Sequence, residues 1–241
     1  MIENLKLTAM KAILGLFFLI AIFSCKTDNQ FVIEGTIDGN SDDEWIYLTE
    51  FLEPEPYIDS VLINNGRFTF KGNVDYPEVH VLNNNSDTAF KYFYFFLEPA
   101  TMEIRINPGD WTYGSTIMGG PVNDEYNEKI RSSEIRLVNL NRETMKKMSG
   151  ADSTEQIELE QVRKESEDQH KQLCLDFISD HPDSPISPYL LGDLFVRIPF
   201  DEAQNILNSF SNENKQTSIC LSLQERLDMM KKYINGSLET E

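Results

Sequence analysis

The chain of 241 residues carries 21 Lys and Arg side chains against 40 Asp and Glu, which gives a formal net charge of −19 at pH 7. A surface this acidic is repelled by nucleic-acid phosphates and by anionic lipid head groups, which argues against a nucleic-acid partner and against membrane binding through basic patches. The length allows one large domain or two small ones.

An apolar run at residues 12–23 is the first predicted element, with Lys6 and Lys11 before it and Ser24 directly after it. Crossing a hydrocarbon core takes about 20 apolar residues, whereas runs of about 10 to 14 are typical of the apolar part of a signal peptide. Positive charge, apolar run and small residue follow one another in the order of a secretory signal. We therefore predict a signal peptide over residues 1–24.

The sequence Ile22-Phe-Ser-Cys25 at the end of that segment resembles a bacterial lipobox. The resemblance implies that the thiol of Cys25 is acylated, with palmitate among the acyl chains, and that residues 25–30 form a short polar tether. Several acyl chains suffice for stable anchoring, so we expect a lipid-anchored protein of the cell envelope, in the outer membrane of a double-membrane bacterium. The alternative is an ordinary secretory signal followed by a free thiol. Met10 begins as good a signal as Met1, so the first residue stays open.

From residue 31 to about 118, short apolar runs alternate with turn residues, which is typical of an all-β domain. Asn64-Asn-Gly66 lies between two of these runs, and Asn-Gly supplies the positive φ angles of a tight turn, so we predict a hairpin there. The expected strands cover residues 31–37, 45–49, 58–63, 67–72, 78–82, 90–97 and 101–106.

After Pro121 the apolar period becomes helical. One helix is expected from about Tyr126 to Gly150, and Ser153-Thr-Glu-Gln156 predicts a capping-box start for a second helix that ends near Asp180 and pairs with the first as an antiparallel hairpin. Three shorter helices follow; they start at Ser187-Pro188, at Asp201, and before a stripe formed by Cys220, Leu223, Leu227, Met230 and Ile234.

The predicted fold class is α+β: an antiparallel β-sandwich-like domain over residues 31–120, followed by an all-helical region over residues 121–241.

The run from Phe90 to Leu97 is unusually aromatic. Alternation along a strand places Tyr92 and Tyr94 on one face, with Phe93 and Phe95 on the other. Two interpretations follow. The favoured one is a central strand covered by sheet on one side and by helices on the other. The other is an aromatic binding face for a sugar or a partner protein, with Tyr92 and Tyr94 as its site residues.

Few residues are candidates for catalysis or metal binding. Cys174 and Cys220 each lie on an apolar helical stripe, which favours buried thiols over a disulfide. His170 and Cys174 have the spacing of two metal ligands on one helix, but no third ligand can be placed beside them, so we predict no metal site. The sequence contains no nucleophile elbow, P-loop, His-Glu-x-x-His or Cys-x-x-Cys, and we expect no catalytic residues and no cofactor.

Several short motifs occur in an order that resembles a known family. The matching pieces are Phe31-Val-Ile-Glu-Gly35, Asp59-Ser-Val61 followed by Gly66-Arg-Phe-Thr-Phe-Lys-Gly72, Tyr76-Pro77, Phe96-Leu-Glu-Pro99, Gly114-Ser115 and Asn123-Asp-Glu-Tyr126. Their order is similar to the N-terminal domain of unknown function that precedes a thioredoxin-like domain in many envelope lipoproteins, and the helical tail is similar to the linker helices of those proteins. Those relatives carry redox chemistry in a Cys-x-x-Cys, which this sequence lacks, so the resemblance implies the accessory region alone.

The expected function is a non-catalytic, lipid-anchored binding or accessory module of the envelope, with a separately encoded thioredoxin-like protein as one candidate partner. The alternative is an enzyme of unrecognised type whose acidic groups lie in a cleft between sheet and helices. A conserved cleft carboxylate with a raised pKa is the feature that would favour the enzyme.

Overall fold

The computed structural model describes residues 29–39, 43–52, 58–85 and 90–238. Cys25, the expected signal peptide and most of the expected tether lie outside these ranges, so their predicted roles stay predictions. No helix within the described ranges combines the length and the apolar character needed to cross a membrane.

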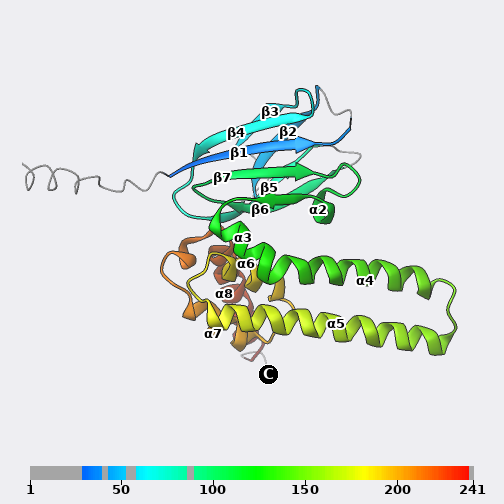
Figure 1. Ribbon diagram of the computed structural model, residues 1–241. Coiled ribbons are helices and arrows are strands. Elements are labelled where there is room, and N and C mark those ends of the chain that lie inside the picture. The colour runs from blue at the N-terminus through cyan, green and yellow to red at the C-terminus, as the bar shows by residue number, and fades with distance from the viewer. Residues whose placement is uncertain (1–28, 40–42, 53–57, 86–89, 239–241) are drawn as a thin grey trace, which may run out of the picture.

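The N-terminal region is a sandwich of two four-stranded sheets (Figure 1). Neighbouring strands are antiparallel except for β1 and β7, which run parallel. In order across each sheet, the strands are β4 (Arg67–Asn73), β1 (Gln30–Ile37), β7 (Thr101–Ile106) and β8 (Thr116–Met118), and then β3 (Asp59–Leu62), β2 (Trp45–Glu50), β5 (Glu78–Asn83) and β6 (Tyr92–Leu97).

Alternating apolar side chains of both sheets fill the sandwich core, as the period-two pattern of the sequence requires. In β1, Phe31 and Ile33 point inward, and in β7 Met102 and Ile104 do the same. Gly35 interrupts the pattern because a β-carbon there would lie 2.0 Å from the Phe68 ring of the paired strand. The α+β class and the sandwich are thereby confirmed, and only the short strand β8 was not predicted.

The predicted hairpin is right in its turn and wrong in its pairing. Asn65 and Gly66 adopt positive φ angles of 51° and 66°, and Asn64 and Arg67 exchange backbone hydrogen bonds of 2.9 and 3.0 Å. However, β3 pairs with β2 and β4 pairs with β1, so the chain passes from one sheet to the other at this turn. Local turn chemistry fixes the reversal, whereas the choice of partner strand depends on which sheet buries each apolar face.

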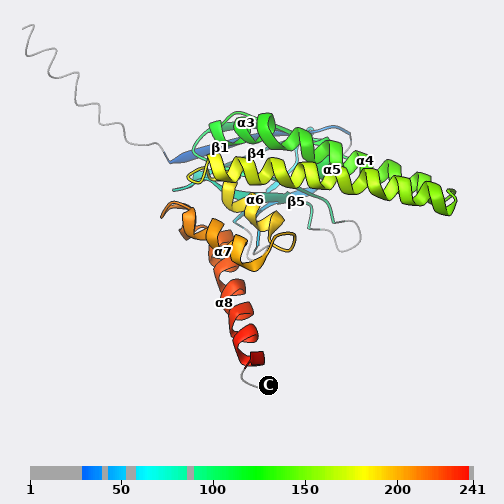
Figure 2. The ribbon, with the colours of Figure 1, turned by 90° about the horizontal axis from the view of Figure 1, so that it is seen from below.

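Below the sandwich lies a helical region whose first two long helices form an antiparallel hairpin, as predicted (Figure 1 and Figure 2). The first rod is continuous from α3 through a π-helical segment, η1, into α4, and it projects with α5 beyond the sandwich. The helical elements are α2 (Trp111–Gly114), α3 (Pro121–Tyr126), η1 (Asn127–Arg131), α4 (Ser132–Met148), α5 (Ser153–Asp180), α6 (Ile186–Leu194), α7 (Phe200–Ser209), η2 (Asn214–Gln216) and α8 (Ser218–Leu238).

Two predicted helix starts need correction. The capping box of α5 is formed by Asp152 with Glu155, one residue before the predicted start, because the Asp152 carboxylate reaches the free N–H groups of Thr154 and Glu155. Helix α6 begins at Ile186, so Pro188 lies at its third position, where a proline still removes no intrahelical hydrogen bond.

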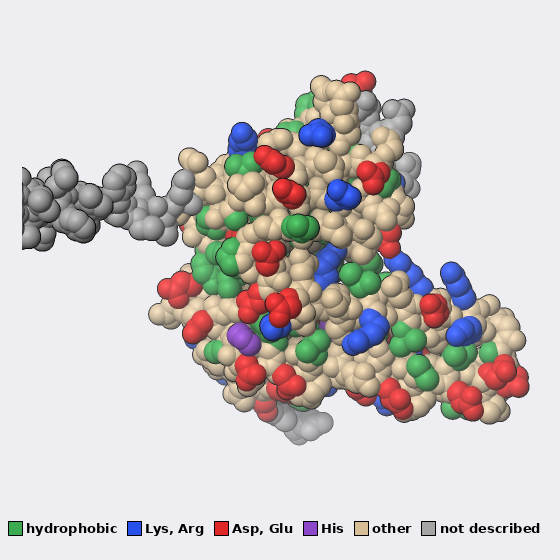
Figure 3. All heavy atoms as spheres, viewed as in Figure 1, with side chains coloured by type: hydrophobic (Ala, Val, Ile, Leu, Met, Phe, Trp, Pro, Cys, Tyr) green, Lys and Arg blue, Asp and Glu red, His purple; other side chains and the backbone are tan. Residues whose placement is uncertain are grey.

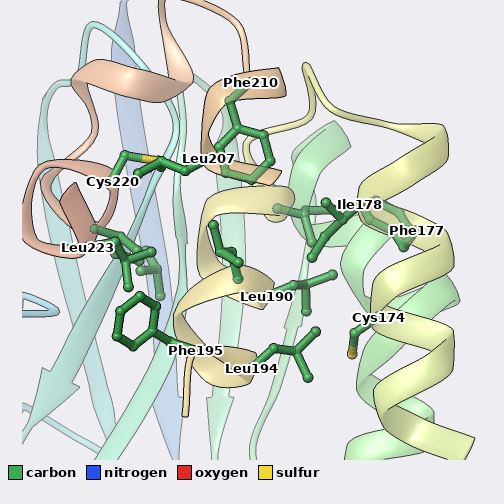
Figure 4. Close-up of a cluster of buried hydrophobic side chains, with 14 of the residues drawn as sticks. Cys174, Phe177, Ile178, Leu190, Leu194, Phe195, Leu207, Phe210, Cys220 and Leu223 are labelled. Atoms are coloured by element: carbon green, nitrogen blue, oxygen red, sulfur yellow. The ribbon is translucent and has the colours of Figure 1, made fainter. Parts of the chain in front are cut away.

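A second apolar core joins the helices to the outer face of the β5–β6 sheet (Figure 4). Cys174 of α5 and Cys220 of α8 are both buried and free, and they lie on opposite sides of the cluster in Figure 4. This confirms the buried-thiol interpretation. The apolar stripe of α8 ends earlier than predicted, since Met230 is 43% exposed, and the side chain of Ile234 lies outside the described part of the chain.

Strand β6 is covered on both faces as favoured by the sequence, but it lies at the edge of its sheet and not in the centre. Phe93 and Phe95 enter the sandwich core, whereas Tyr94 and Phe96 enter the helical core. The prediction that β6 is a central strand was wrong, because helix α3, and not another strand, covers its free edge.

Side chains, and not a strand, pair with that edge: the Thr112 hydroxyl of α2 donates to the Tyr92 carbonyl (2.9 Å). Asn123 of α3 accepts a hydrogen bond from the Phe96 N–H (3.0 Å) and donates one to the Phe96 carbonyl (2.7 Å), as a neighbouring strand would. The Glu98 carboxylate accepts bonds from the N–H groups of Val122 (3.1 Å) and Asn123 (2.9 Å) at the start of α3. These contacts fix the helical rod against the sandwich.

Candidate functional site

A cleft of about 230 Å³ lies where the β6 edge of the sandwich meets the helical hairpin. We call it the tyrosine cleft. Its walls come from parts of the chain far apart in sequence: Phe51, Tyr92, Tyr94, Tyr113, Glu134, Leu137, Val138, His170, Tyr189, Asp193 and Arg197.

Aromatic rings form one side of the cleft around Tyr189 of α6. The ring centroid of Tyr189 lies 5.8 Å from those of Tyr94 and Tyr126 and 5.9 Å from that of Phe51. Such edge-to-face and tilted contacts stabilise aromatic clusters beyond the area they bury. The rings are therefore held in fixed positions by one another.

Glu134 of α4 lies at the base of the cleft among these rings. Its Oε2 atom accepts hydrogen bonds from the hydroxyl groups of Tyr126 (2.5 Å) and Tyr94 (3.2 Å). Burial raises the pKa of Glu134, although the tyrosine hydrogen bonds and the charge of Arg131 oppose the shift. Burial also raises the pKa of Tyr94, Tyr126 and Tyr189, so the hydroxyl groups stay protonated and act as donors at neutral pH.

The charge of Arg131 acts on this carboxylate, but the hydrogen bonds of Arg131 go to backbone carbonyls. Its Nη2 atom donates to the carbonyls of Thr112 (3.0 Å) and Ser115 (3.1 Å), and its guanidinium lies 5.1 Å from the Phe93 ring centroid. Arg131 closes the π-helical segment η1, and such segments are frequent at functional sites. The arginine therefore ties α2 to the helical rod, and among the residues that the structure describes Glu134 has no ion-pair partner.

His170, which lines the cleft, and Cys174, which contacts His170, are unsuited to nucleophilic chemistry. His170 Nδ1 lies 3.1 Å from Ser133 Oγ, and its Nε2 lies 3.5 Å from Cys174 Sγ. Burial lowers the pKa of His170 and raises the pKa of Cys174 to about 12, so the imidazole is neutral and the thiol is protonated at pH 7. Within the described ranges, no three His, Cys, Asp or Glu side chains are placed to hold a metal ion.

Both site residues proposed from the sequence line the cleft. Tyr94 is 8% exposed and belongs to the helical core, whereas Tyr92 is 41% exposed and lies at the mouth. The face is thus partly core and partly open, and its role as a binding face stays a prediction. An ion pair between Asp193 and Arg197 forms another part of the rim.

Sequence reasoning missed Glu134 and Tyr189. A signal for Glu134 was present, because it follows Tyr126 and Ile130 at a spacing of four on the apolar stripe of the first long helix, where a carboxylate is unexpected. No local signal marked Tyr189, which becomes part of the cleft only when α6 packs beneath β6.

Comparison with curated proteins and with solved structures gave no significant match. A scan against protein families matched residues 31–126 to the model described as Domain of unknown function (DUF4369). The matched segment runs from β1 through α3, so it includes both the sandwich and the Glu98–Asn123 contact. Residues 31–126 are therefore similar to the DUF4369 family, in agreement with the resemblance found in the sequence.

Proposed function

We propose that the protein is a lipid-anchored cell-envelope protein that acts as a non-catalytic binding or accessory module, with the tyrosine cleft as its binding site. The observation that carries this proposal is the convergence of aromatic rings and a partly buried carboxylate on one cleft, from β6, α2, α4 and α6. Concave sites with a few convergent polar groups on mostly apolar walls are the usual form of small-ligand sites. At about 230 Å³ the cleft suits a compact ligand, or a side chain of a partner such as a thioredoxin-like envelope protein.

Anchoring rests on Cys25. Replacing Cys25 with Ser removes the thiol that acylation requires, so we expect Cys25→Ser to abolish labelling by a radioactive fatty acid and to release the protein from the outer-membrane fraction. Retention of both label and membrane association would refute the lipid anchor.

Binding is tested by photocrosslinking in cells. p-Azidophenylalanine placed at Tyr92, at the mouth of the cleft, is expected to give a reproducible adduct with a ligand or partner. The matched control places the same amino acid at Trp45, which is an aromatic residue of similar exposure (51%) that does not line the cleft. The same adduct at both positions, or none at Tyr92, would count against the cleft as a binding site.

The raised pKa of Glu134 favours a second candidate, an enzyme that uses this carboxylate as a general base. The two candidates differ in the effect that Glu134→Gln has on turnover of a ligand identified by crosslinking. An enzyme loses turnover of that ligand in the variant, whereas a binding module turns over the ligand in neither form.

A further inference from the structure

We propose that the tyrosine cleft takes a compact organic cation, a quaternary ammonium or protonated amine, with Glu134 as its counter-charge and the rings of Tyr92, Tyr94 and Tyr189 around it. This inference rests on the proposed function, because it names the ligand class of the same cleft.

The charge of Glu134 is the first argument. Within the described residues no Lys or Arg nitrogen lies within 4.0 Å of its carboxylate, which instead accepts hydrogen bonds from two neutral hydroxyl groups. A carboxylate that is partly buried and has no paired cation is costly, and the protein's own groups do not offset this cost, since the pKa of Glu134 is raised despite Arg131. A cationic ligand would supply the missing partner.

The aromatic walls are the second argument. The face of a tyrosine or phenylalanine ring attracts a cation, and rings grouped around a quaternary ammonium are a common recognition device. Tyr94, Tyr189 and Phe51 are linked in one chain of ring contacts of 5.8 and 5.9 Å, and Tyr92 and Tyr113 border the same space. Carboxylate and rings thus lie around one volume.

The other charged groups near Glu134 do not neutralise it. Arg131 donates to two backbone carbonyls, and Arg197 is paired with Asp193 at the rim. His170 is neutral at pH 7 because burial lowers its pKa. Arg136 lies on the exposed side of α4 and donates to Ser133 Oγ (3.3 Å). Glu134 is therefore the group whose titration should control binding of a cation.

The test compares choline with 3,3-dimethylbutan-1-ol, a neutral molecule of the same shape, by calorimetric titration of the full chain in a non-ionic detergent. We expect choline to bind at least about tenfold more tightly than the alcohol, the ratio that about 1.4 kcal/mol of cation–ring and ion-pair attraction gives. Its N-methyl proton resonances should move upfield because they lie over ring faces. Binding should weaken as the pH falls and Glu134 takes up a proton. Equal affinity for both molecules, or no binding of choline, would overturn the proposal that the cleft binds an organic cation.

Glu134→Gln should remove the preference for choline and leave the affinity for the alcohol unchanged. Glu143→Gln, on the exposed distal part of the same helix, is the matched control and should keep the preference. Tyr92→Ala, at the open mouth, is a second variant that spares the core, and we expect it to weaken choline binding about threefold to tenfold. A preference retained in Glu134→Gln would contradict the assignment of the counter-charge. If an adduct forms at Tyr92 but choline does not bind, the cationic ligand class is wrong and the proposed binding function stands. If neither the adduct nor choline binding is observed, the proposed binding function is wrong as well.

Discussion

At the scale of single residues, Glu134 concentrates the unusual chemistry of this protein. An acidic side chain on an apolar helical stripe is expected to destabilise the fold unless something compensates its charge. Here two tyrosine hydroxyl groups supply hydrogen bonds and Arg131 supplies a more distant charge, and the pKa nevertheless stays raised. The proposed role of Glu134 in binding would account for a carboxylate at this position.

The first prediction concerns the pH dependence of stability. Because the pKa of Glu134 is raised above its ordinary value of 4.5, the stability linked to its proton is present in full below pH 4.5 and is lost as the pH rises through the raised pKa. Glu134→Gln keeps a neutral side chain at every pH. We therefore expect the variant to unfold at higher urea concentration than the wild type at pH 8, with a difference that shrinks toward pH 4.5. A constant difference across this range would contradict the assignment.

The second prediction concerns the thiols. Burial raises the pKa of Cys174 to about 12 and that of Cys220 to about 11, and neither side chain is accessible. In a Cys25→Ser background, both thiols should resist Ellman's reagent at pH 8 in the native state and react fully in urea. Rapid native reaction of either thiol, measured by absorbance, would show that the helical core opens readily.

At the scale of elements, the junction between β6 and α3 holds the two halves of the molecule in register. Asn123 substitutes for a missing neighbour strand and Glu98 caps the helix start, so two motifs separated in sequence meet at one contact. The cleft depends on this junction because Glu134 lies on the same helical rod.

Asn123→Ala leaves the Phe96 N–H and carbonyl groups buried without partners. We expect a loss of about 2–6 kcal/mol in the free energy of unfolding, since each of the two unsatisfied groups costs about 1–3 kcal/mol. Asn139→Ala, at an exposed position of α4, is the control and should change stability by less than about 0.5 kcal/mol. Urea denaturation measures the stability of both variants. Equal stability of the two would contradict the structural role assigned to Asn123.

The elements themselves were largely predictable, because their signals are local. Strand alternation and helical periodicity placed β1, β7, α4 and α5 close to their observed bounds. Partner choice was not predictable in the same way. The passage of the chain between sheets after β3 and the edge position of β6 depend on contacts made by distant residues. For the cleft, Tyr92 and Tyr94 were identified from their strand, whereas Glu134 and Tyr189 are brought beside them only by helix packing.

At the scale of the whole molecule, the outer face of the β5–β6 sheet and the helices share the second apolar core, so the two halves depend on each other. Val79, Tyr94 and Phe96 of the β5–β6 sheet belong to the helical core. The face visible in Figure 3 carries acidic side chains over both halves with basic ones between them, so the overall negative charge is not confined to one half.

Truncation before Pro121 tests this dependence. The shortened chain exposes the apolar outer face of β5 and β6 and leaves the β6 edge unpaired, which favours association between copies. We expect it to aggregate or to form oligomers in size-exclusion chromatography with light scattering. A soluble monomer would contradict the shared core.

The central claim is that the tyrosine cleft itself is the binding site, and the most direct measurement blocks it. Val138→Trp on α4 fills part of the cleft without removing a tyrosine or a charge. In cells carrying p-azidophenylalanine at Tyr92, we expect Val138→Trp to abolish the photocrosslinked adduct while expression and membrane anchoring stay unchanged. An adduct that persists in the same yield with the cleft filled would contradict the claim.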